Sequence, residues 1–369
     1  MIRVPLLAGR IAAPPRCRGR RALFALPLLL LVSCAPPADT EIRFASVAPP
    51  PPVAEAGTPA RFTDPARFTE NEFIAADGAR LPLRRWLPPQ ADNVKAVILA
   101  LHGFGDYSRA FEMPARVWAS RGIATYAFDQ RGFGGAPGFG FWAGAGELAA
   151  DAVTATRILR RIHPGRPMYL LGESMGSAVA VLAVTGGAGP DGVILSAPAV
   201  WGRPTMDLLP RLLLFAGVRL FPDMVLTGRD LHIQASDNLP MLKALAQDPM
   251  VFKGARIATV YGLVDLMDEA LAAAPRLAAP TLLMYGAHDE VVPRPPIADF
   301  VAHLPPDPGH TRRLAYYAQG YHLLLRDLEG AAVAGDVASW VLDRKARLPS
   351  RADALESAER WPPSPGRSG

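Results

Sequence analysis

Short apolar runs alternate with longer amphipathic stretches over most of the chain. Apolar runs of this length, rich in Val, Ile, Leu and Tyr, predict buried strands. They lie at residues 94–101, 123–128, 168–171, 192–196, 281–285 and 313–317. Between or after them, residues 110–121, 147–163, 177–184 and 333–344 are predicted to be helices. This alternation predicts an α/β domain with a mostly parallel sheet and helices on both faces.

Two regions depart from this alternation. Residues 72–76 and 81–86 flank Asp77-Gly78, which is typical of a β-hairpin. Residues from about 200 to 275 hold no clear strand and are rich in leucine, with Pro210 and Arg211 interrupting the apolar run. That run is therefore not a transmembrane helix. The region predicts a helical cap inserted over the sheet.

A Gly-Glu-Ser-Met-Gly pentapeptide at residues 172–176 stands between a predicted strand and a predicted helix. In such a tight turn the serine hydroxyl stands clear of the sheet, and the N-terminus of the following helix favours negative charge. The bare pattern also arises by chance in unrelated loops. Its strand-and-helix context favours the functional interpretation, with Ser174 as a nucleophile.

Two further candidates follow later strands. Asp289 lies after the strand predicted at 281–285, and His322 lies after the strand predicted at 313–317. The order serine, acid, histidine is that of α/β-hydrolases. Ser174 would attack an acyl carbonyl, His322 would transfer its proton to the leaving alcohol, and Asp289 would orient the imidazole. Glu290 is the alternative acid, and a surface-loop role is the alternative for His322.

Residues 102–105, His-Gly-Phe-Gly, end a predicted strand and are suited to form an oxyanion hole. The backbone N–H groups of Phe104 and Met175 are the expected donors, identified by position and not by residue type. The alternative is a simple turn. A metal site is not predicted, because residues 288–290, His-Asp-Glu, are adjacent and cannot all face one ion. No cofactor is predicted either.

These motifs together resemble the monoacylglycerol lipase and lysophospholipase group of α/β-hydrolases, the serine aminopeptidase-like family. The resemblance covers residues 70–345 and includes Phe-Asp-Gln-Arg-Gly at 128–132, Asp-Pro at 248–249 and Tyr-His at 321–322. It implies an α/β-hydrolase fold with a cap, and hydrolysis of carboxylic esters without a metal or cofactor. Glu173 stands where the group commonly has histidine, and Ser177 where it usually has glycine. The subfamily is therefore left open.

The leucines of the predicted cap favour lipid-like substrates, such as monoacylglycerols or lysophospholipids. The same leucines would also be present if they only packed the cap onto the sheet. A small-ester esterase and an aminopeptidase-like hydrolase are the alternatives within enzymes. A non-catalytic, membrane-tethered binding protein on the same fold is the alternative outside them. The sequence does not indicate an oligomeric state.

The N-terminal residues predict export. Residues 1–34 hold six arginines and no Asp, Glu or Lys, and the apolar segment at 22–32 is too short to span a bilayer comfortably. Leu-Val-Ser-Cys at 31–34 resembles the lipobox of bacterial lipoproteins. That resemblance implies a signal peptide at 1–33, cleavage before Cys34 and a lipid on its thiol. An ordinary signal peptide or an uncleaved anchor is the alternative, and Arg20-Arg21 weakly suggests twin-arginine export.

The expected location is a bacterial membrane, with the periplasmic side of the outer membrane favoured. The formal net charge of +5 includes those six arginines, so the charge without them is −1. Such a protein has no electrostatic basis for binding nucleic acid. Cys17 lies within the predicted signal, so the mature chain would retain Cys34 alone and form no internal disulfide.

The predicted organisation has four parts. Residues 1–33 are the signal peptide and residues 34–64 a Pro-rich tether, which includes four consecutive prolines at 49–52. Residues 65–347 are the α/β-hydrolase domain, with the cap at about 200–275. Residues 348–369 are charged and then rich in Pro and Ser, and they are predicted to be a disordered tail.

Overall fold

The computed structural model describes residues 66–90, 93–227, 233–354 and 361–362. The predicted signal peptide, Cys34 and the tether to residue 64 lie outside these ranges, so they stay predictions.

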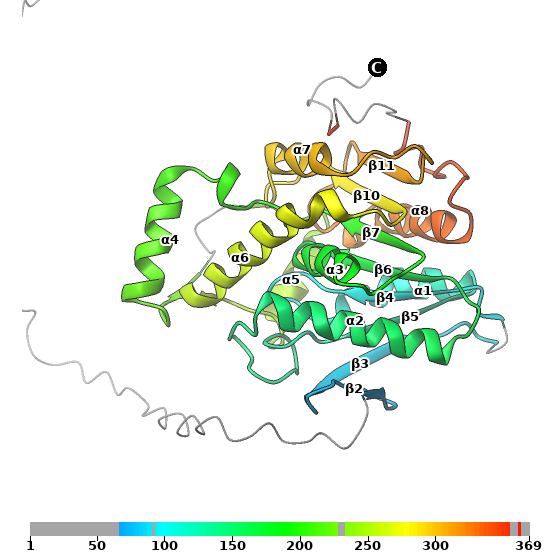
Figure 1. Ribbon diagram of the computed structural model, residues 1–369, viewed down its shortest axis with the longest axis horizontal. Coiled ribbons are helices and arrows are strands. Elements are labelled where there is room, and N and C mark those ends of the chain that lie inside the picture. Colours follow the sequence, from blue (N-terminus) through cyan, green and yellow to red (C-terminus); the bar gives the residue numbers. More distant parts are fainter. Residues whose placement is uncertain (1–65, 91–92, 228–232, 355–360, 363–369) are drawn as a thin grey trace, which may run out of the picture. The chain divides into compact units, whose positions relative to one another are not determined.

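In the described part of the chain, nine strands form one sheet in the order β1-β2-β3-β5-β4-β6-β7-β10-β11 (Figure 1). Their bounds are β1 (Arg67–Phe68), β2 (Glu72–Ile74), β3 (Arg80–Trp86), β4 (Ala96–Leu101), β5 (Ile123–Phe128), β6 (Met168–Glu173), β7 (Gly192–Ser196), β10 (Thr281–Gly286) and β11 (Arg312–Tyr317). The strands from β5 to β11 are parallel neighbours, and β1 to β3 continue the sheet with antiparallel pairing. The mostly parallel sheet and the hairpin at Asp77-Gly78 are both confirmed.

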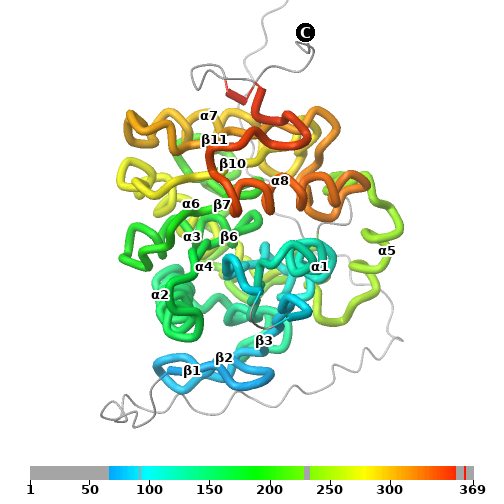
Figure 2. Tube along the Cα trace, turned by 90° about the vertical axis from the view of Figure 1, so that its right-hand side faces the viewer, coloured from blue at the N-terminus to red at the C-terminus, as the bar shows by residue number. Residues whose placement is uncertain are grey.

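Helices cover both faces of this sheet. Figure 2 shows the strands between α1 and α8 on one side and α2, α3 and α6 on the other. The bounds are α1 (Glu112–Ser120), α2 (Ala145–Ile162), α3 (Met175–Thr185), α6 (Ile257–Ala273), α7 (Arg294–His303) and α8 (Gly330–Leu342). Along β4, Val97 and Leu99 contribute to the core beneath α2 and α3, whereas Ile98 contributes to the core beneath α1 and α8. Because both faces are buried, the strands are continuous apolar runs.

The cap contains α4 (Leu208–Leu220), β8 (Val225–Leu226), α5 (Leu239–Gln247) and β9 (Ala255–Arg256). β8 and β9 pair antiparallel, in a region where the pattern predicts no strand. The predicted cap range also includes α6, but Leu266 and Ala270 of this helix are buried in the main core, where α6 packs against α3. The cap therefore joins the main domain within α6. No helix of the described ranges is long and apolar enough to cross a membrane.

The C-terminal segment differs from the predicted disordered tail. Leu348 and Trp361 are 1% and 3% exposed, and Asp353 forms an ion pair with Arg313 of β11 at 2.5 Å. The Trp361 ring also packs edge-on against Tyr285 of β10. Two apolar side chains and one paired carboxylate therefore hold residues 348–354 and 361–362 on the domain. Residues 355–360 and 363–369 lie outside the described ranges.

Candidate active site

Ser174 occupies the sharp turn between β6 and α3. Its backbone has φ 53° and ψ −117°, in a region that non-glycine residues rarely adopt. A Cβ on Gly172 would lie 2.3 Å from the carbonyl carbon of Gly176, and a Cβ on Gly176 would lie 2.0 Å from the carbonyl oxygen of Leu101. Only glycine fits at either position. The Ser177 hydroxyl donates to the Gly172 carbonyl at 2.7 Å and closes the turn from inside.

Asp289 and His322 form a buried hydrogen-bonded pair. Oδ2 of Asp289 lies 2.9 Å from Nδ1 of His322, and their side chains are 0% and 5% exposed. Oδ1 of Asp289 accepts the backbone N–H groups of Val291 and Val292, each at 2.9 Å. The carboxylate is thus fixed by its own loop and presents its second oxygen to the imidazole. This arrangement holds the Nδ1 proton on His322 and leaves Nε2 as the acceptor.

These residues follow strands that end at one edge of the sheet. Ser174 follows β6, Asp289 follows β10 and His322 follows β11, while the loop with Phe104 follows β4. Ser174 and His322 line one cavity of about 600 Å³. No hydrogen bond joins their side chains in the described structure, although catalytic hydrogen bonds are often long without substrate. The sheet thus gathers side chains that are far apart in sequence.

The cavity walls are mostly apolar. Phe104 and Phe252 form one side, with their rings edge-on at 5.8 Å. The cap contributes Leu226, Leu245 and Val251, and α6 contributes Val260, Leu263 and Met267. A cavity of this volume and lining suits an apolar ligand of small-molecule size.

Phe104 and Met175 lie where an oxyanion hole requires donors. Met175 is the first residue of α3, and such a position leaves its N–H without a partner inside the helix. The Phe104 N–H makes no backbone hydrogen bond within the described residues. A Cβ built on Gly103 would lie 3.4 Å from the Ser174 Cβ, so the loop that carries Phe104 packs directly on the serine turn.

A buried charge cluster beside Ser174 was not predicted from the sequence. Nη1 of Arg326 lies 2.6 Å from Oδ2 of Asp106, and Nη2 lies 2.6 Å from Oε1 of Glu173. All three residues line the cavity. Burial raises the pKa of the Glu173 carboxyl, and the Arg326 charge opposes that rise. Burial alone would lower the Arg326 pKa, but the two carboxylates raise it above its usual range.

One signal for this cluster was present in the chain. An acidic side chain directly before the serine of a buried turn must either have a cationic partner or be protonated itself. The pattern does not say which of the many arginines supplies that partner.

The alternative acid and the neighbouring histidine occupy other environments. Glu290 is exposed and accepts the backbone N–H of Gln234 from the cap region at 2.8 Å. His288 stacks on the Tyr321 ring, with the ring centroids 5.2 Å apart. In the described ranges, no group of three His, Cys, Asp or Glu side chains could hold a metal ion.

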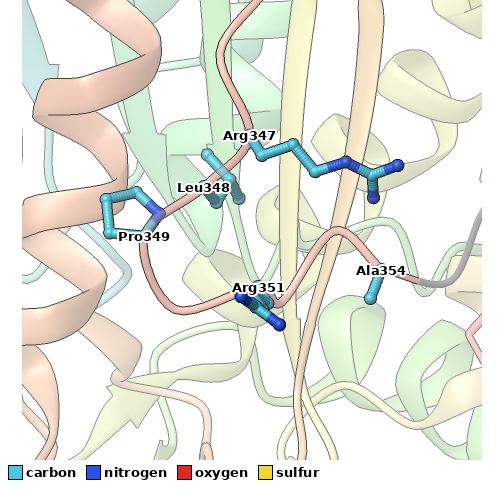
Figure 3. Close-up of a pocket in the computed structure, with 5 residues that line it drawn as sticks. All are labelled: Arg347, Leu348, Pro349, Arg351 and Ala354. Carbon is cyan, nitrogen blue, oxygen red and sulfur yellow. The ribbon is translucent and has the colours of Figure 1, made fainter.

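A second cavity, of about 560 Å³, lies in the C-terminal segment. Figure 3 shows its lining residues, which are Arg347, Leu348, Pro349, Arg351 and Ala354. None of the predicted site residues contributes to it. The chemistry is therefore expected in the cavity at the ends of β4, β6 and β11.

Comparison with known protein families identifies the family that shares this arrangement of residues. The family described as "Serine aminopeptidase, S33" matches residues 92–329, which include the Ser174 turn, the Asp289 loop and His322. The chain belongs to this family. The match to the S33 family covers well over half of the chain, in agreement with the α/β-hydrolase fold predicted from the motifs.

Relatives of this S33 chain include a monoacylglycerol lipase of Mycolicibacterium smegmatis, 27% identical over 74% of this chain and 97% of the relative. Human monoglyceride lipase is 26% identical over 74% of this chain and 90% of its own length. A soluble variant of monoglyceride lipase from Saccharomyces cerevisiae, solved with a substrate analog, aligns with a TM-score of 0.62 at 20% identity, over 78% of this chain and 99% of that structure. The family, the fold and the relatives together identify the protein as a serine ester hydrolase.

Proposed function

We propose that the protein hydrolyses carboxylic esters of lipids with one acyl chain, such as monoacylglycerols or lysophospholipids, through an acyl-enzyme on Ser174. The observation that carries this proposal is the cavity of about 600 Å³, which joins Ser174 and His322 to apolar walls from the cap. Its size and lining suit a single acyl chain. The names of the relatives from Mycolicibacterium smegmatis and human agree with that substrate class.

The proposed reaction has two halves. Ser174 Oγ attacks the ester carbonyl while Nε2 of His322 takes its proton, and the N–H groups of Phe104 and Met175 bind the oxyanion. The C–O bond to the alcohol breaks, and the imidazolium returns its proton to that alcohol. Water then attacks the acyl-enzyme while His322 takes one of its protons. The acyl C–O bond to Ser174 Oγ breaks, the imidazolium returns the proton to Oγ, and the fatty acid is released. Asp289 stabilises the imidazolium throughout.

The charges in the cavity argue against an aminopeptidase-like activity. Such an enzyme needs a carboxylate to hold the α-ammonium of its substrate. Asp106 and Glu173 are the acidic residues that line the described cavity, and both are already paired with Arg326. A small-ester esterase remains the second candidate, and chain-length preference separates it from a lipase.

The test is substitution of Ser174, followed by a series of esters. Ser174→Ala should lower turnover of p-nitrophenyl decanoate and of a monoacylglycerol by about 10³-fold or more, because the nucleophile is lost. Circular dichroism and thermal unfolding of the variant should match the wild type. His322→Ala should be nearly as inactive, and a fluorophosphonate probe should label Ser174 in the wild type only.

Three outcomes would contradict the proposal. Turnover within tenfold of wild type in Ser174→Ala would remove the serine mechanism. Far better turnover of p-nitrophenyl acetate than of the decanoate, with no lipid cleaved, would favour the small-ester esterase. No labelling of the folded wild type would favour a non-catalytic binding protein.

We also propose that the mature chain begins at Cys34, carries a lipid on that residue and is held at a bacterial membrane. The support is the arginine-rich start, the short apolar segment and the Leu-Val-Ser-Cys sequence at 31–34. A lipid anchor followed by a Pro-rich tether would keep the hydrolase close to its lipid substrates.

A further inference from the structure

Arg326 lies beside the catalytic residues without being one of them. It ends the short helix η5 (Leu324–Arg326), four residues after His322. Its side chain is 8% exposed, and it lines the cavity that holds Ser174. The two nitrogens at the end of its guanidinium contact carboxylates at 2.6 Å each, Asp106 on one side and Glu173 on the other.

Each carboxylate belongs to a different loop of the active site. Asp106 lies two residues after Phe104, in the loop with the first oxyanion donor. Glu173 lies directly before Ser174, at the end of β6. One planar cation therefore joins the oxyanion loop, the serine turn and the histidine loop.

We propose that Arg326 is a positioning residue, which holds the oxyanion loop and the Ser174 turn in register with His322. The inference rests on the proposed role of Ser174 as nucleophile. The catalytic geometry depends on these three loops, and a misplacement of about 1 Å can cost about 100-fold in rate. A guanidinium can hold both carboxylates at once because its nitrogens form a rigid fork, which the single ammonium of lysine does not provide.

The remaining contacts of Glu173 and Asp106 that the structure describes do not reach the histidine loop, so the linking role falls to Arg326. Within the described residues, the Glu173 carboxylate has Arg326 as its hydrogen-bond partner, and its Oε2 has none. Asp106 uses its other oxygen locally, on the N–H of Tyr107 at 2.8 Å. In the described part of the chain, no other hydrogen bond or ion pair ties these two carboxylates to the histidine loop.

The test compares Arg326→Lys with a matched control. Arg131 also joins two carboxylates, Asp77 and Asp151, but it does not line the cavity. For each variant, kcat and KM are measured with p-nitrophenyl butyrate, along with the second-order rate of Ser174 labelling by a fluorophosphonate. Arg326→Lys should lower kcat and the labelling rate by about 10- to 100-fold and change KM by less than about threefold. Arg131→Lys should stay within about twofold of wild type in both rates.

A triple variant separates positioning from folding. Asp106→Asn, Glu173→Gln and Arg326→Met together remove all three charges at similar volume, and such neutral replacements often preserve stability. The triple variant should fold and have a near wild-type KM. Its kcat should be lowered as is expected for Arg326→Lys. It also decides the matter if Arg326→Lys fails to fold.

The inference is overturned if Arg326→Lys or the triple variant keeps the wild-type kcat, because the cluster would then serve folding alone. An equal loss of rate in Arg131→Lys would overturn it as well, since the effect would not be specific to this arginine. Failure of the probe to label the wild type would instead remove the proposed function on which it rests.

Discussion

Single residues at the serine turn are fixed by backbone geometry. Ser174 has a positive φ, and the glycines two positions before and after it have no room for a Cβ. Such strain is typical of sites where the chain must present one side chain at a defined place. The two glycines are therefore a direct consequence of how closely β4, β6 and α3 approach one another.

His102 is a second residue whose role is set by burial. It is fully buried after β4, and its Nε2 accepts the Gln130 N–H at 2.9 Å. Its Nδ1 lies 2.9 Å from the Gly103 carbonyl, so the proton is assigned to Nδ1 and the ring is neutral. This histidine supports the oxyanion loop by hydrogen bonds and does not face the cavity residues that would react.

The first prediction concerns the pH dependence of stability. Burial lowers the pKa of His102 below its usual 6.5, so below that pH the unfolded chain binds a proton that the folded chain does not. Stability should therefore fall as the pH drops, by up to about 1.4 kcal/mol per pH unit from this residue. His102→Gln, which keeps an acceptor for Gln130, should have a shallower acid-side slope than the wild type in urea unfolding between about pH 7 and 5. Equal slopes for the two proteins would contradict this assignment.

At the level of elements, α4 stands out by its exposure, which it shares only with the shorter α5 among the described α-helices. None of its residues is buried, and Leu209, Leu212 and Leu213 are 65%, 54% and 64% exposed. It packs on α6 and stands to the side of the sheet in Figure 1. An apolar surface of this kind, on a protein proposed to cleave lipids, is suited to contact the lipid phase.

The second prediction is a separation of two activities by one change on α4. Leu213→Glu should lower hydrolysis of monoacylglycerol in micelles or vesicles by roughly tenfold, because burying one leucine in lipid is worth about 1.5–3 kcal/mol. Hydrolysis of soluble p-nitrophenyl butyrate should not change. Ile162→Glu at the end of α2 is the matched control, since Ile162 is 48% exposed but lies outside the cap. An equal loss on both substrates would show that α4 acts on the cavity and not on the lipid surface.

On the scale of the whole molecule, the sheet and the chain ends have separate tasks. The sheet brings Ser174, Asp289 and His322 to one edge, although 115 and 33 residues separate them in order along the chain. The C-terminal segment packs back on the domain through Leu348 and Trp361. The N-terminal residues are proposed to hold the enzyme at a membrane.

The third prediction tests that anchor. Cys34→Ser should abolish incorporation of an alkyne fatty acid and move the full-length protein from the detergent phase to the aqueous phase of Triton X-114, because the thiol that would carry the lipid is gone. Cys17→Ser is the control, since Cys17 lies within the predicted signal peptide and should have no effect. Labelled Cys34→Ser protein, or an unlabelled wild type, would refute lipidation at this position.

Much of this protein was determined by local sequence. The strands β5 and β7 have the predicted bounds, because a strand buried on both faces must be a continuous apolar run. The serine turn was recognisable because its glycines and its flanking strand and helix are consecutive in the chain. The positions of Asp289 and His322 after later strands followed from the same alternation.

Only the tertiary structure decided which distant groups meet. Arg326 binds Glu173 across 153 residues, and no periodicity in the chain selects that arginine among the others. The second half of α6 belongs to the main core, and Trp361 is buried against Tyr285, because packing partners for these side chains come from remote strands and helices. Local patterns report what a segment can become, whereas charge pairing and burial depend on neighbours that exist only once the chain has folded.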